Sequence, residues 1–300
     1  MKILLLGKNG QVGWELRRAL APLGEVVALG RDGKGDLVGD LENESGLRAT
    51  VAAIAPDVIV NAAAYTAVDR AEGEPELAQR INAAAPAALA REAAARGIWL
   101  VHYSSDYVFD GDGSRPWRED DPARPLSVYG KSKLAGEEAI RESGCRHLIL
   151  RTSWVYAARG DNFARSMLRL AAERECLTVV ADQVGAPTGA DLIADVTAHL
   201  VRGVSGVSGE NEAARGGVYH LAAAGETSWY GYARFVIDEA RRHGIVLKVR
   251  EIAPILTSSW PTPAARPLNS RLDTARLRDA FAINLPDWRF GVGRMLDEIL

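Results

Sequence analysis

The chain has 300 residues, of which 47% are hydrophobic and 25% are charged, and its formal net charge is -3 at pH 7. This balance is typical of a soluble globular protein with a substantial core, and it excludes a broad basic surface for nucleic acid. No apolar run approaches the ~20 residues of a membrane span, and the apolar start of the chain is too short for a signal peptide. Its two cysteines lack metal-ligand spacing and favour a reducing compartment. We therefore expect a cytoplasmic protein that binds neither nucleic acid nor membrane.

Apolar runs and helical patterns alternate through the first half of the chain. The apolar runs are short and continuous, as in strands buried on both faces, and they lie at 2–7, 25–30, 57–64, 98–105 and 147–156. Helical patterns lie between them at 11–24, 44–56, 75–96 and 129–143. This alternation predicts an α/β fold with a doubly wound, parallel, Rossmann-type sheet, whose ligands lie at the carboxyl ends of the strands.

The pattern loosens after residue 153. It predicts strands near 177–180 and 217–222, a surface loop at 202–217 and an extended, proline-rich segment at 258–272. We expect residues 1–152, with parts of about 185–240, to form the dinucleotide-binding domain. Residues 153–184 and 241–300 are expected to form a smaller C-terminal α/β domain that binds the substrate.

The first strand leads into a glycine turn, "GKNGQVG", with Gly7, Gly10 and Gly13 in a G-x-x-G-x-x-G register. Such glycines allow a tight turn, a close approach of the backbone to a pyrophosphate, and close packing of helix on strand. The amino end of the following helix, at Gln11 and Val12, adds N–H groups for the phosphates. The turn therefore predicts a nicotinamide dinucleotide cofactor.

The end of the second strand bears on the choice of cofactor. Arg31 stands where a basic side chain accommodates the 2′-phosphate of NADPH, while Asp32 would suit the free ribose of NADH. We expect NADPH to be preferred and leave NADH open. Asp40 and Leu41 are candidates for the adenine contact, and the small residues at 62–64 leave room for the cofactor; these are Ala62, Ala63 and Ala64.

Tyr129 and Lys133 lie one helical turn apart in "SVYGKSKLAGEEA" and should project from the same helix face. Taken alone, such a pair is more typical of a solvated helix face than of a catalytic site. The fourth strand, however, ends in "HYSSDYVFDG", and its carboxyl end should lie near the start of this helix. A hydroxyl, a phenol and an ammonium group are thus expected to converge where a nicotinamide would extend. Gly130 is expected to leave room beside the cofactor.

These motifs occur in the order and spacing of the extended short-chain dehydrogenase/reductase superfamily, which the chain resembles. The segments "PDVIVNAAAYTAVDRAE", "LRTSWVY", "DQVGAPTGA" and "RPLNSRL" resemble the dTDP-4-dehydrorhamnose reductase family, and the resemblance covers essentially all 300 residues. It implies reduction of dTDP-4-dehydro-L-rhamnose to dTDP-L-rhamnose. This is the last step of dTDP-L-rhamnose biosynthesis, which serves lipopolysaccharide or cell-wall polysaccharide formation.

The resemblance also implies roles for individual residues. Tyr129 matches the proton donor, and Lys133 is expected to lower the pKa of the phenol and to bind the nicotinamide ribose. Ser105 aligns with a threonine of the family, so the hydroxyl is kept and the methyl group is lost. Tyr103, just before it, is expected to contact the cofactor.

Other positions bear on the substrate. Asp106 is followed by Tyr107 rather than by the glutamate of the sugar 4,6-dehydratases, which favours reduction over elimination, and Asp106 is expected to contact the sugar. Trp154 corresponds to the family's sugar-contacting platform. The segments 182–190 and 266–272 are expected to line the nucleotide side, with contacts from Arg266, Asn269 and Arg271.

Some family members bind Mg²⁺ between subunits through three acidic residues. The matching positions are Glu15, Asp191 and Glu298, so a homodimer with Mg²⁺ is a further hypothesis. Two alternatives to the leading function stay open at this point: a related nucleotide-sugar reductase or epimerase, and a non-catalytic NADP-binding regulatory subunit.

Overall fold

The computed structural model describes residues 1–205 and 215–300. A parallel sheet of six strands has the order β10-β5-β4-β3-β1-β2. Its strands are β1 (Lys2–Leu6), β2 (Glu25–Leu29), β3 (Val58–Asn61), β4 (Trp99–Ser105), β5 (Arg146–Thr152) and β10 (Gly217–His220). All residues of β3 and β4 are buried, as expected for strands covered on both faces. The predicted doubly wound α/β fold is confirmed.

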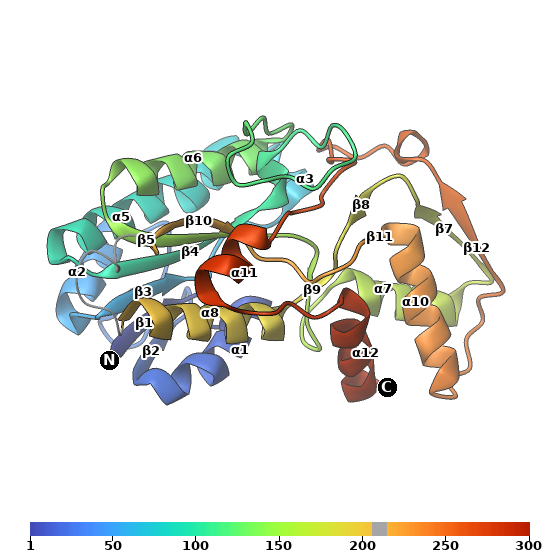
Figure 1. The fold of residues 1–300 in the computed structure, drawn as a ribbon, viewed down its shortest axis with the longest axis horizontal. Coiled ribbons are helices and arrows are strands. Elements are labelled where there is room, and N and C mark those ends of the chain that lie inside the picture. Colours follow the sequence, from blue (N-terminus) through green and yellow to red (C-terminus); the bar gives the residue numbers. More distant parts are fainter. Residues whose placement is uncertain (206–214) are drawn as a thin grey trace.

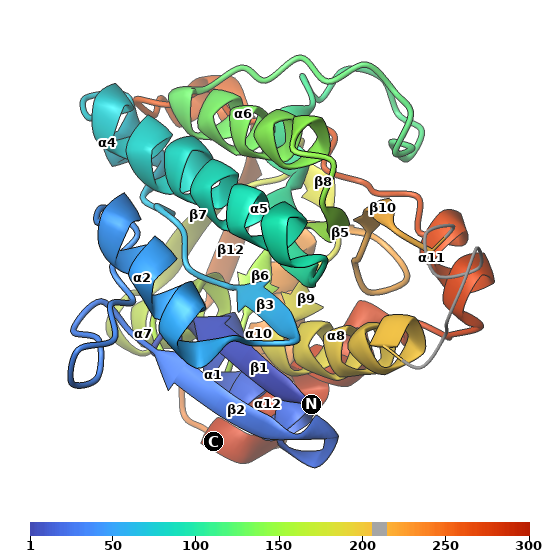
Figure 2. The ribbon, with the colours of Figure 1, turned by 90° about the vertical axis from the view of Figure 1, so that its left-hand side faces the viewer.

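Helices cover both faces of the sheet (Figure 2). On one face α1 (Gln11–Leu20) packs against α8 (Ala190–Ser205), and their apolar sides join Ile3, Leu5 and Val101 in one core cluster. On the other face α2 (Glu44–Ile54), α5 (Ala85–Arg96) and α6 (Val128–Glu142) pack in sequence. The two cores hold the sheet rigid, so the strand ends are fixed positions for a site.

The helix predicted at 75–96 forms in three parts: α4 (Pro75–Gln79), a π-helical segment (Arg80–Ala84) and α5, which ends at Gly97 with φ +64°. In the π-helical segment, Asn82 accepts a hydrogen bond from Tyr65 N and donates to Ser132 Oγ on α6. A Cβ at Gly136 would collide with the Asn82 carbonyl oxygen, so α6 can pack this closely only with glycine there. The irregular turn is therefore part of the packing beneath α6.

The C-terminal elements form a second group beside the sheet, on the right in Figure 1. Here α10 (Trp229–Arg242) packs against α7 (Phe163–Glu173) and α12 (Trp288–Ile299), and the strands β7 (Cys176–Val180) and β12 (Glu251–Ile255) pair in parallel. Two short strand pairs complete this half: β6 (Val155–Tyr156) with β9 (Thr188–Gly189), and β8 (Val184–Gly185) with β11 (Thr227–Ser228). The helix α11 (Ala275–Phe281) instead packs against β10, and its Leu277 and Phe281 belong to the core of the main sheet. The strands expected near 177–180 and 217–222 are thus confirmed.

Two expectations need correction. The predicted strand 147–156 is not continuous, because β5 ends at Thr152, Trp154 adopts φ +47°, and β6 then pairs outside the main sheet. The predicted loop 202–217 is wrong for 202–205, which continue α8, and its central residues 206–214 lie outside the described part of the chain. The division into two domains stays a prediction: α8 and β10 pack on the main sheet, whereas α10 packs against α7 and α12.

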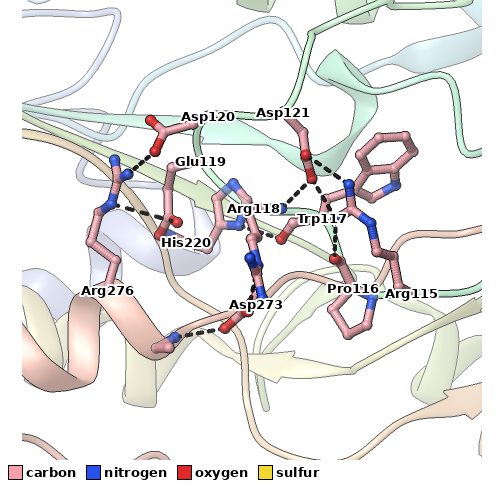
Figure 3. A network of polar contacts seen from close by, with 11 residues as sticks. Arg115, Pro116, Trp117, Arg118, Glu119, Asp120, Asp121, His220, Asp273 and Arg276 are labelled. Carbon is pink, nitrogen blue, oxygen red and sulfur yellow. Dashed lines mark hydrogen bonds and ion pairs between the residues drawn. The ribbon is translucent and has the colours of Figure 1, made fainter.

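The long connection that leads into α6 is tied down by ion pairs (Figure 3). Arg276 on α11 reaches Asp120 and Glu119, and Glu119 accepts a hydrogen bond of 2.9 Å from His220 N on β10. Arg115 meets Asp121 through two hydrogen bonds of 2.8 Å. Because this connection ends at Ser127, whose Oγ caps α6 by accepting from Gly130 N, the network helps to fix the start of α6.

Within residues 1–205 and 215–300, no helix is both long enough and apolar enough to cross a membrane.

Candidate active site

A cavity of about 690 Å³ lies at the carboxyl edge of the sheet, where the fold predicts a ligand. It brings together sixteen of the residues predicted from the sequence: Gly7, Gly10, Gln11, Val12, Arg31, Asp40, Leu41, Ala62, Ala63, Ala64, Tyr103, Ser105, Asp106, Tyr129, Lys133 and Trp154. It also contains residues that the motifs did not single out, among them Asn9, Thr66, Val68, Ser104, Thr152 and Trp229. The cavity is one continuous space from the glycine turn to the indole rings.

The glycine turn has the geometry that a pyrophosphate cradle needs. Gly7 has φ +86°, and a Cβ there would lie 2.6 Å from Ala63 N. A Cβ at Gly13 would collide with the Gly7 carbonyl oxygen, so Gly13 serves the packing of α1 on the turn and does not line the cavity. Gly10 is the residue before α1. The N–H groups at the amino end of α1 have no partner within the helix, and this end of the helix lines the cavity.

Tyr129 is buried at the start of α6 and packs edge-to-face on Tyr107, with ring centroids 5.5 Å apart. Burial and, to a smaller extent, the nearby Asp106 charge raise the pKa of Tyr129 to about 12, while a hydrogen bond with the Ser105 hydroxyl opposes both. Ser105 Oγ in turn donates to Asp106 Oδ1 over 2.9 Å. The strand end and the helix thus place a serine hydroxyl and a protonated phenol side by side.

Lys133 lies one turn further along α6 and is only 2% exposed. Its Nζ donates a hydrogen bond of 2.6 Å to the Tyr103 carbonyl oxygen on β4. Burial lowers the pKa of Lys133 to about 8, and the charge of Glu137 opposes that shift. We call Ser105, Tyr129 and Lys133 the polar wall of the cavity.

Two expectations about these residues need correction. Lys133 was expected to lower the pKa of Tyr129, but burial and Asp106 dominate, and the pKa of the phenol is raised. Gly130 was expected to leave room beside the cofactor. A Cβ there would instead collide with the Tyr107 carbonyl oxygen. Glycine at position 130 therefore allows α6 to pack closely against the backbone at Tyr107.

Glu137 forms a buried ion pair beneath the polar wall. Arg151 on β5 donates to its carboxylate through Nε at 2.9 Å and through Nη2 at 2.6 Å, and both side chains are at most 4% exposed. The pair joins α6 to β5 one turn beyond Lys133. No sequence motif indicated this ion pair, because a glutamate and an arginine 14 positions apart do not form a recognisable pattern.

Asp106 is buried beside Ser105, and burial raises the pKa of its carboxyl group to about 6 while hydrogen bonds from Ser270 and Ser105 oppose the shift. Two further hydroxyls, Ser104 Oγ and Thr152 Oγ1, are buried at the cavity without a hydrogen-bond partner among the described residues. Buried polar atoms of this kind normally have a partner. Together with the glycine cradle, they make the cavity a good fit for the polar groups of a nicotinamide dinucleotide.

Two indoles form another part of the cavity lining. Trp154, which follows β5, and Trp229, the first residue of α10, stack with centroids 3.7 Å apart and an interplanar angle of 15°. Both rings line the cavity. We call this pair the aromatic wall.

Several predicted ligand contacts lie outside the cavity lining. Arg266 pairs with Asp69 over 2.8 Å, and Arg271 pairs with Glu226 over 2.7 Å. Asn269 is buried and donates to the Arg115 carbonyl oxygen. None of the residues 182–190 lines the cavity; in that segment Asp182 and Gln183 bond to Thr257 instead.

The proposed metal ligands do not form a site within one chain. Among residues 1–205 and 215–300, no group of three acidic, histidine or cysteine side chains could hold a metal ion. The carboxylate of Asp191 pairs with Arg294 over 2.7 Å and that of Glu15 pairs with Arg18 over 3.3 Å. Mg²⁺ held between two subunits therefore stays a prediction, and no step of the chemistry below depends on a metal.

A parallel doubly wound sheet, a glycine cradle, and Ser105, Tyr129 and Lys133 in one cavity define a Rossmann-type, nicotinamide-dependent oxidoreductase. Comparison with known proteins narrows this class. The family model described as "RmlD substrate binding domain" matches residues 1–300. The dTDP-4-dehydrorhamnose reductase of Escherichia coli K12 is 54% identical over 299 residues, which is 100% of this chain and 98% of the relative. That of Burkholderia thailandensis is 49% identical over 306 residues, with 100% and 99% covered.

Solved structures agree. The dTDP-4-dehydrorhamnose reductase of Clostridium acetobutylicum superposes with a TM-score of 0.88 at 34% identity, covering 100% of this chain and 99% of the other. That of Bacillus anthracis, solved in complex with NADP, has a TM-score of 0.86 at 33% identity, with 99% of each chain covered. The chain belongs to the dTDP-4-dehydrorhamnose reductase family.

Proposed function

We propose that this protein reduces dTDP-4-dehydro-L-rhamnose to dTDP-L-rhamnose with a nicotinamide cofactor. The observation that carries the proposal is the convergence of Ser105, Tyr129 and Lys133 in a cavity that begins at the glycine turn. Full-length similarity to enzymes named for this reaction supports it. A purely regulatory NADP-binding protein would have no use for all three polar side chains at one end of the cavity.

When bound, the cofactor would supply a hydride to the carbonyl carbon of the sugar, and side chains of this protein would stabilise and protonate the carbonyl oxygen. As charge develops there, the Ser105 hydroxyl would turn its hydrogen bond from Asp106 Oδ1 to this oxygen, and Tyr129, protonated because its pKa is about 12, would transfer its proton to give the alcohol. The positive charge of Lys133, held 2.6 Å from the Tyr103 carbonyl, stabilises the phenolate that remains. Hydride and proton together account for the two-electron reduction.

The cofactor and the sugar are assigned to opposite regions of the cavity. Gly7 and Gly10 to Val12 would hold the pyrophosphate, and Arg31, which lines the cavity, would hold the 2′-phosphate of NADPH in preference to NADH. Asp106 and Trp154 would contact the sugar. A homodimer remains a prediction beyond the single chain.

A paired assay tests the function. Purified protein with dTDP-4-dehydro-L-rhamnose should oxidise NADPH, and more slowly NADH, as a fall in absorbance at 340 nm. Product identity should be checked as dTDP-L-rhamnose by mass and NMR. Absence of cofactor oxidation with both NADPH and NADH would refute the proposal, and reduction of UDP-linked or non-deoxy ketosugars at equal rates would point to a different member of the class.

A further inference from the structure

Trp154 has a backbone conformation that a large side chain rarely adopts. Its φ of +47° lies in the left-handed region, which is unusual for a residue of this size. Such a conformation persists where surrounding contacts determine it, and it is often found at functional sites. The contacts around the Trp154 ring therefore show what the fold holds in place.

Two contacts, one with its backbone and one with its ring, hold Trp154 in place. Its carbonyl oxygen accepts a hydrogen bond of 3.2 Å from Thr188 N, which ties the residue to β9. Gly185 lies against the ring: a Cβ there would sit 2.9 Å from Trp154 Cε2 and 3.1 Å from Ser270 Cβ. Glycine at this position leaves the space that the indole occupies.

The third contact of Trp154 is with Trp229. Its indole stacks on Trp154, and its own Nε1 donates a hydrogen bond of 3.0 Å to Gln183 Oε1. Gln183 is 6% exposed and donates through Nε2 to Thr257 Oγ1 over 3.1 Å. Phe163 also packs against Trp229, with ring centroids 4.6 Å apart. The stack is thus anchored in the C-terminal core while one side of it faces the cavity.

We propose that Trp229 is a specificity-determining residue of the sugar subsite: with Trp154 it forms a rigid apolar wall that selects a deoxygenated sugar carbon over its hydroxylated counterpart. This inference rests on the proposed function. A 6-deoxy sugar has hydroxyl groups for the polar wall and one methyl group for an apolar surface. Placing a hydroxymethyl group against two indoles would leave a hydroxyl without a hydrogen-bond partner, which disfavours binding.

Equilibrium binding tests the wall without relying on turnover. The probes are dTDP-L-rhamnose, the matched dTDP-L-mannose with its 6-hydroxyl, and NADPH, each titrated by calorimetry. In the wild type, dTDP-L-rhamnose should bind about 10-fold or more tighter than dTDP-L-mannose. Trp229→Leu should weaken dTDP-L-rhamnose about 5- to 10-fold and reduce that preference, while the Kd for NADPH stays within about twofold.

Gly185→Ala provides an independent variant, because its added methyl group displaces the Trp154 ring without changing a residue that lines the cavity. It should weaken dTDP-L-rhamnose in the same direction. Trp229→Phe keeps a smaller aromatic ring and should restore most of the binding. Because Trp229→Leu could fail to fold, Gly185→Ala and Trp229→Phe keep the test decisive.

A spectroscopic control reports the stack itself. Stacked indoles give coupled bands in circular dichroism, and Trp154→Phe and Trp229→Phe should remove the same bands, whereas Trp260→Phe, at an exposed indole outside the cavity lining, should leave them. Wild-type sugar preference in both Trp229→Leu and Gly185→Ala would overturn the inference. Failure of the NADPH oxidation assay, with these binding differences present, would count against the reductase function and not against the wall.

Discussion

The two walls of the cavity are built in different ways. The polar wall comes from one strand end and the first two turns of one helix, so Ser105, Tyr129 and Lys133 are close in sequence as well as in space. The aromatic wall joins Trp154 to Trp229, 75 positions later, through a stack and a chain of contacts in the C-terminal core. The polar wall supplies the proton and its electrostatic support, whereas the aromatic wall supplies shape. We therefore expect changes in the polar wall to affect chemistry and changes in the aromatic wall to affect binding.

Tyr129→Phe should give the largest effect. Removing the phenol hydroxyl takes away the proton donor and should lower kcat by about 10²- to 10⁴-fold. NADPH binding, followed by fluorescence titration, should remain nearly intact, because the glycine cradle and Arg31 are unchanged. A Phe variant with wild-type kcat would refute the role of Tyr129.

The polar wall depends on the buried Glu137–Arg151 pair for its position. Arg151→Met should lower the free energy of unfolding by about 3–5 kcal/mol, since it leaves the Glu137 carboxylate buried without its partner. Arg91→Met is the matched control, because its ion pair with Glu44 is exposed and should contribute less than about 1 kcal/mol. Denaturant unfolding of both variants measures the difference. Equal losses would contradict the structural role of the buried pair.

The pH dependence should come from Lys133. Because burial lowers its pKa to about 8, the lysine is charged below that pH and loses its charge above it, so support for the phenolate is lost on the alkaline side. We expect kcat/KM to fall about tenfold per pH unit above pH 8. Lys133→Arg, which stays charged, should flatten this limb in whatever activity it retains. A wild-type profile that is flat to pH 10 would contradict the assignment.

The same contrast explains what could be predicted from the sequence. The alternating strands and helices, the glycine turn and the spacing of Tyr129 and Lys133 are local patterns, and the structure places them as expected. The position of Trp154 was expected, but its left-handed backbone and its stack with Trp229 were not, because they arise from the packing of β8, β11 and α10. Arg266 and Asn269 were expected at the substrate; in the structure they contact Asp69 and the Arg115 backbone, and their roles at the substrate stay predictions. A lone arginine or asparagine carries no local signal that distinguishes these two outcomes.

The most direct test of the division between the walls is steady-state kinetics of Tyr129→Phe and Trp229→Leu, measured side by side with dTDP-4-dehydro-L-rhamnose and NADPH. Tyr129→Phe should lose kcat while its KM for the sugar changes by less than about threefold. Trp229→Leu should raise that KM about 5- to 10-fold while kcat stays within about threefold of the wild type. Loss of kcat in Trp229→Leu to the level of Tyr129→Phe, with an unchanged KM, would contradict the account.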